Sequence, residues 1–176
     1  MLKYYYQIAI DSVGQPYLDA EQQLISQGTT AAAFLQEQIP NATPIAKLII
    51  QVILERIKGN ETFQACLKYL DEIEARIART VLGEPPPEGV ANYLIQNFGN
   101  TVSPLLGVYL IKLEHFWIDW KILAILLYLG RLDSTASDDV LVRFLSTTTS
   151  NDYRNIALQS LVAVGDATVL SKLEAE

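Results

Sequence analysis

The residues in this chain that could do chemistry are few and far apart. His115 is the one histidine and Cys66 the one cysteine, and they stand about 50 positions apart. A zinc site needs three or four Cys, His or carboxylate ligands, and no HxxxH or CxxC spacing is present. Histidine can act as a general base near neutral pH, but no nucleophile in a recognisable motif accompanies His115, and we expect it at a helix end. We predict no metal ion, no cofactor and no catalytic residue.

Acidic side chains cluster at two places without suggesting catalysis. Asp138 and Asp139 stand at an expected helix start, where the positive end of the helix dipole stabilises carboxylates. Asp71, Glu72 and Glu74 form a second group. Paired carboxylates do acid–base work only where their site separates their pKa values, and nothing in the sequence indicates desolvation. We expect both groups on solvated faces, and no P-loop, GxGxxG, GxSxG or HExxH motif occurs.

The most unusual feature is the aromatic segment that contains Phe116, Trp117 and Trp120. Tryptophan is enriched at interface hot spots because it buries a large area and keeps one hydrogen-bond donor. The two rings share a face if the helix already runs at Trp117. They then fill a junction between repeats, anchor a partner protein or line a small-molecule pocket, and the sequence leaves all three open. The candidate partner-binding residues are Trp117, Trp120, Lys121, Tyr128, Arg143, Tyr153 and Arg154.

A second aromatic group, Tyr4, Tyr5 and Tyr6, stands near the start of the chain. Neighbours on a helix point about 100° apart, so at least one ring is expected to be exposed. These rings cover an open end of the molecule or provide a surface for self-association.

Composition and charge indicate a folded, acidic domain. The 176 residues (19.6 kDa) are 50% hydrophobic and 19% charged, with a net charge of −7. The two halves carry similar charge, so no basic stripe exists to hold a phosphate backbone or an anionic membrane. No run of about 20 apolar residues is free of charge, and no signal peptide is recognised. We expect a single domain over 1–176 that works in the cytoplasm, binds another protein and binds neither nucleic acid nor membrane.

Apolar residues recur with helical spacing nearly everywhere, so the sequence predicts an all-α fold without a sheet. Thr43-Pro44 and Ser103-Pro104 each read as a hydroxyl N-cap followed by proline in the first turn. Gly28, Gly59, Gly99 and Gly165 suit helix ends, and the proline-rich segment 83–87 suits an extended joint. The predicted helices are 2–13, 18–27, 29–39, 44–58, 61–81, 88–98, 104–115, 118–132, 137–146 and 152–164, with a short turn at 167–174.

The chain also repeats itself at two offsets. At an offset of 59–60 residues, Thr43-Pro44-Ile45 matches Ser103-Pro104-Leu105, and residues 65–70 match 124–129. At an offset of 33, Asp119-Trp120-Lys121 recurs as Asp152-Tyr153-Arg154. Helical hairpins of about 30 residues bury their apolar stripe only by stacking on neighbours.

The segment 152–167 resembles the HEAT repeat, in which an acidic, a hydrophobic and a basic residue open a helix and a Gly-Asp turn leads to the next. The resemblance is good over 150–173, fair over 117–145 and weak over 29–81. It implies a right-handed α-α superhelix of about four to five HEAT-like hairpins, with a plain helical bundle as the alternative.

The function implied by this resemblance is non-enzymatic protein–protein interaction, as an adaptor, regulatory module or small assembly subunit, in a groove made by successive second helices. HEAT-like proteins also include accessory factors and lyases that act on bilin-carrying light-harvesting proteins, which is the alternative. A further and less favoured alternative is a HEAT-like DNA glycosylase. Resemblance to those enzymes implies a basic cleft, whereas this chain is acidic.

Overall fold

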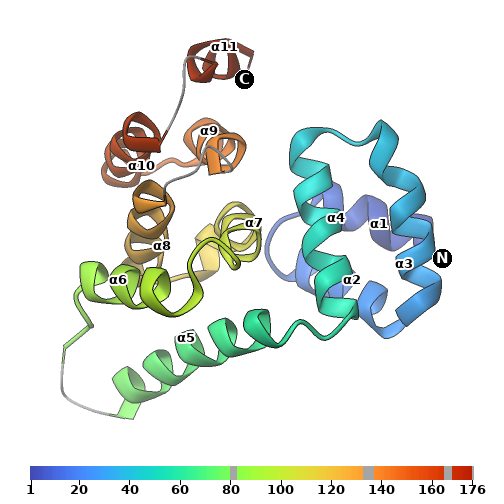
Figure 1. The fold of residues 1–176 in the computed structure, drawn as a ribbon, viewed down its shortest axis with the longest axis horizontal. Coiled ribbons are helices and arrows are strands. Elements are labelled where there is room, and N and C mark those ends of the chain that lie inside the picture. Colours follow the sequence, from blue (N-terminus) through green and yellow to red (C-terminus); the bar gives the residue numbers. More distant parts are fainter. Residues whose placement is uncertain (80–82, 133–136, 165–167, 176) are drawn as a thin grey trace.

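The computed structural model describes residues 1–79, 83–132, 137–164 and 168–175, and these residues form helices and connecting turns without any strand (Figure 1). The fold is all-α, as the apolar periodicity predicts. The helices are α1 (Leu2–Asp11), α2 (Gln15–Ser26), α3 (Gly28–Gln38), α4 (Pro44–Ile57), α5 (Glu61–Arg79), α6 (Pro87–Phe98), α7 (Ser103–Leu113), α8 (Asp119–Arg131), α9 (Asp138–Thr147), α10 (Asn151–Val164) and α11 (Val169–Ala175), with short 3-10 turns at Ile39–Asn41 and Glu114–Phe116.

Local signals in the sequence explain most of the helix ends. The Thr43 side chain accepts a hydrogen bond from the Ala46 amide at 3.2 Å, which confirms it as the N-cap of α4. Gly28, Gly59 and Gly99 have φ values of 55°, 72° and 53°, a left-handed conformation that favours glycine. Residues 83–86 lie outside helices, in agreement with the expected proline-rich joint. The expected glycine cap at 165 and the end of the helix predicted to run to 81 lie outside the described residues.

The cap predicted at Ser103 is wrong. The helical hydrogen bonds of this region begin before the serine, because the Leu106 amide already donates to the Val102 carbonyl at 3.0 Å. Ser103 is therefore the first residue of α7, and its side chain makes no capping hydrogen bond.

Helices α4 to α11 form two layers, and from α6 onward successive helices alternate between them. In the first layer, α6, α8 and α10 lie side by side, and α5 lies next to α6. In the second layer, α4 packs on α7, α7 on α9 and α9 on α11. Figure 1 shows the first layer rising from α5 through α6 and α8 to α10. The N-terminal helices α1–α3 pack with one another and with α4.

Two helical glycines allow close contact between neighbours within the layers. A Cβ on Gly130 of α8 would come within 2.5 Å of the Ser160 Oγ and 2.9 Å of the Ser160 Cα on α10. A Cβ on Gly107 of α7 would come within 2.9 Å of a Val140 methyl on α9. Each glycine therefore stands at a close contact between two helices of one layer, where a larger side chain would have to displace its neighbour.

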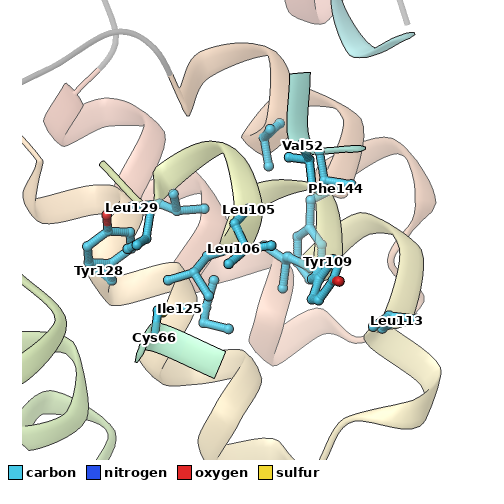
Figure 2. Packing of buried hydrophobic residues seen from close by; sticks show 14 of the residues in the cluster. Val52, Cys66, Leu105, Leu106, Tyr109, Leu113, Ile125, Tyr128, Leu129 and Phe144 are labelled. Carbon is cyan, nitrogen blue, oxygen red and sulfur yellow. The ribbon is translucent and has the colours of Figure 1, made fainter. Parts of the chain in front are cut away.

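The core is continuous across the two layers, with α7 at its centre. Leu105, Leu106 and Tyr109 of α7 lie among residues of α4, α8 and α9 (Figure 2). Nine of the eleven residues of α7 are buried. A helix enclosed on almost all sides must be apolar around its circumference, which explains the run of hydrophobic residues from 105 to 111.

Candidate functional site

The seven candidate partner-binding residues differ strongly in exposure. Trp120, Lys121 and Tyr128 are buried, whereas Trp117, Arg143 and Tyr153 are half-buried and Arg154 is exposed. The first three therefore belong to the interior of the isolated chain. A partner that binds through this set can therefore contact only the remaining four side chains, those of Trp117, Arg143, Tyr153 and Arg154.

The two tryptophans do not share a helix face. Helix α8 begins at Asp119, and Trp117 is in an extended conformation with φ −95° and ψ 145°. Trp120 is 1% exposed and belongs to the core. Trp117 packs edge-on against Tyr109 of α7, with ring centroids 6.5 Å apart.

Lys121 joins three parts of the chain. Its Nζ lies 2.9 Å from the Glu74 Oε1 on α5 and 4.6 Å from the centre of the Trp117 ring. The contact with the ring is a cation–π interaction. The positive charge of Lys121 therefore forms an ion pair within the molecule, which links α8 to α5.

Two tyrosines of the candidate set also make internal contacts. The Tyr128 hydroxyl donates to the Gly99 carbonyl at 2.6 Å, and burial raises the pKa of this side chain. The Tyr153 hydroxyl on α10 donates to the Asp119 carboxylate on α8. Both bonds link neighbouring parts of the first layer, so these tyrosines stabilise the arrangement of its helices.

A hollow of about 280 Å³ opens on the second layer, between the start of α4 and helices α9 and α11. We call it the second-layer groove. Its walls contain an apolar part from Pro44, Ile45 and Val142 and a charged part from Asp139, Arg143 and Lys172, with Thr43 at the edge. Arg143 is the one candidate residue from the sequence that lines this groove.

The expectation that Asp138 lies on a solvated face is wrong. Asp138 is 0% exposed, and Lys172 of α11 lies 3.8 Å from its carboxylate and 3.3 Å from that of Asp139. The reason is tertiary: α11 packs against α9 and brings a lysine to the acidic first turn of that helix. The helix dipole predicted from sequence is still favourable there, but packing buries the first of the two acids.

A buried polar cluster that was not predicted from the sequence lies at the junction of α2, α4 and α7. The Arg56 Nη1 lies 2.8 Å from the Glu21 Oε2, while the hydroxyls of Tyr109 and Tyr17 donate to the same carboxylate at 3.0 and 3.2 Å. Burial raises the pKa of Glu21 and of both tyrosines. The sequence feature that could have indicated this cluster is the i, i+4 spacing of Tyr17 and Glu21 on the apolar stripe of α2.

A second polar contact fastens the turn between α1 and α2. The Lys112 Nζ donates to the carbonyls of Ile10 and Ser12 at 2.7 and 2.8 Å, and burial lowers the pKa of Lys112 to about 8. The Gly14 amide donates to the Lys112 carbonyl at 2.8 Å. The N-terminal helices are thus held to α7 by main-chain and side-chain hydrogen bonds.

Cys66 and His115 lie in different environments of the described structure. Cys66 is buried and its pKa is raised to about 12 by burial, so it is a poor nucleophile. His115 is exposed in the 3-10 turn after α7. No three His, Cys, Asp or Glu side chains of the described ranges come together as metal ligands.

None of the described helices combines the length and apolarity needed to cross a bilayer. No family model, curated protein or solved structure matches this chain.

Proposed function

We propose that this protein is a HEAT-like helical-repeat protein of the right-handed solenoid type, which binds another protein in the second-layer groove. The alternation of helices between two layers supports the repeat architecture. The cytoplasmic location expected from the sequence belongs to the same proposal.

The groove itself is the observation that carries the binding role. Three elements far apart in sequence contribute to it: the start of α4, the middle of α9 and α11. A surface built from packed helices loses little conformational entropy when a partner docks. Its apolar wall supplies contact area, and the charged residues at its edge supply orientation and selectivity.

The test compares proteins captured by the full chain and by two groove variants, Ile45→Arg and Arg143→Glu. Glu37→Arg on the exposed side of α3 is the matched control, since it also changes one surface side chain. Each variant is first checked for the wild-type helical circular dichroism spectrum and unfolding midpoint. We expect at least one protein to be held by the wild type and the control and lost from both groove variants. If both groove variants capture the same proteins as the wild type, the groove is not the binding site.

A further inference from the structure

The two ends of the first layer offer opposite charges on apolar surfaces. Helix α5 is at one end and α10 at the other, with α6 and α8 between them (Figure 1). We propose that copies of this chain associate head to tail, with the outer face of α5 in one copy packed on the outer face of α10 in the next. The α10 end adjoins the second-layer groove, because Val142 lines both hollows, but none of the residues changed in the tests below lines the groove.

The outer face of α5 points away from the rest of the layer. Tyr69 marks the face toward α6, because its ring stacks on Tyr93 with centroids 4.0 Å apart. Leu67 and Asp71 each stand two positions from Tyr69, about 200° around the helix. They line a shallow hollow of about 510 Å³ together with Gln64, Lys68, Glu72 and Ala75, all from α5.

The outer face of α10 likewise points away from its neighbour in the first layer, α8. Ser160 marks the face toward α8, because its hydroxyl donates to the Leu126 carbonyl at 2.9 Å. Leu158 and Val162 each stand two positions from Ser160, and they are 40% and 84% exposed. Arg154 is one turn before Leu158, so the three side chains form one stripe along α10. Leu158 and Arg154 also line a hollow of about 400 Å³ that is completed by Leu173 of α11 and by residues of α9.

Charge identifies a second copy as the occupant. Arg154 is the one charged residue among the described residues lining the α10 hollow, and its guanidinium donates to the Thr148 carbonyl. At the α5 hollow, Lys68 pairs with Glu72 at 3.8 Å. Asp71 is exposed there and has no hydrogen-bond or ion-pair partner among the described residues. One end therefore offers the Asp71 carboxylate beside Leu67, which is partly buried against the core, and the other offers the Arg154 guanidinium beside the exposed Leu158.

Packing α5 of the next copy on α10 continues the order of helices already present within one chain. Each of α6, α8 and α10 packs on its neighbour in the first layer, and residues 65–70 of α5 match residues 124–129 of α8 in sequence. Because the two contacting faces differ, the interface is heterologous and produces open chains or rings in place of a closed two-fold dimer.

The first experiment measures the mass distribution of the full chain by sedimentation from about 1 μM to about 1 mM, the range of weak association. We expect species larger than a dimer to accumulate with concentration and to decrease at high salt, which screens the charge pair. Asp71→Arg and Arg154→Asp should each weaken association about tenfold, and the double variant should restore it. Glu37→Arg is the matched control and should leave association unchanged.

The second experiment blocks one end at a time. Leu67→Asp removes the α5 end and Leu158→Asp removes the α10 end, and circular dichroism confirms that both variants fold. Each variant alone should stay monomeric, whereas an equimolar mixture should form a dimer and nothing larger, since one intact α5 face meets one intact α10 face. A wild type that stays monomeric up to about 1 mM overturns the proposal. The proposal is also overturned if the wild type forms only a closed dimer and the equimolar mixture of the two variants stays monomeric. Neither outcome bears on the second-layer groove, whose residues are unchanged.

Discussion

Trp117 and Trp120 show how strongly position relative to a helix start decides the role of a residue. Both are tryptophans on the same short segment, yet Trp120 is 1% exposed inside α8 and Trp117 is half-buried before that helix begins. The two rings would share a helix face only if the helix already ran at Trp117, two residues before its observed start. The helix predicted over 118–132 begins one residue before the observed start at Asp119, so Trp117 lies outside the helix in both cases.

The stability contributions of the two rings should differ accordingly. Trp120→Ala should lower the free energy of unfolding by about 3–5 kcal/mol, because it leaves a cavity in the core. Trp117→Ala should cost about 1 kcal/mol, since its ring is only partly removed from water. Urea unfolding followed by circular dichroism measures both. Equal losses for the two variants would contradict the different burial described above.

Lys112 should make stability depend on alkaline pH. Its pKa is lowered to about 8 in the folded chain from an ordinary value of 10.5. Above pH 8 the folded state releases this proton while the unfolded state still holds it, so the unfolded state binds more protons and stability increases with pH. Relative to Lys112→Met, the wild type should gain about 2 kcal/mol between pH 7 and about 9.5. A difference that stays constant over this range would show that burial does not lower the pKa of Lys112.

At the scale of the helices, the close contact between α8 and α10 depends on Gly130. Gly130→Ala places a methyl group against the Ser160 Oγ and Cα, and we expect a loss of about 1–3 kcal/mol in the free energy of unfolding. Gly89→Ala in α6 is the matched control, because its new Cβ meets only Pro86 at 3.6 Å. That control should be neutral or slightly stabilising, since alanine favours helix over glycine. Thermal unfolding of the two variants separates packing from helix propensity.

Helix boundaries were largely predictable because proline, glycine and hydroxyl residues mark them locally. Thr43 caps α4 as expected, and the predicted α4 over 44–58 differs from the observed Pro44–Ile57 by one residue. Ser103 fails as a cap because the preceding turn already carries helical hydrogen bonds. Burial of Asp138 and Glu21 could not be predicted, since it depends on helices distant in sequence that pack against them.

At the scale of the whole molecule, a buried ion pair joins the N-terminal helices to the two layers. Removing Arg56 leaves the Glu21 carboxylate, which is 2% exposed, without its cation. Arg56→Met should therefore lower the free energy of unfolding by about 2–3 kcal/mol, and adding Glu21→Gln should recover part of the loss. Lys58→Met is the control, because its pair with Glu55 is exposed on the lysine side and should contribute below about 0.5 kcal/mol. If the double variant is no more stable than Arg56→Met alone, the buried charge is not the source of the loss.

The single cysteine of this chain provides a reporter of motion between α5 and the helices packed against it. Cys66 is 0% exposed and its pKa is raised to about 12, so a thiol-reactive dye cannot label it in the closed arrangement. Labelling requires α5 to lift from its neighbours, and at low dye concentration its rate equals the intrinsic thiol rate multiplied by the fraction of open molecules. Glu74→Gln, which weakens the attachment to Lys121, should accelerate the modification. The labelling rate of the native cysteine thus measures the equilibrium between the closed and open positions of α5, without any engineered probe.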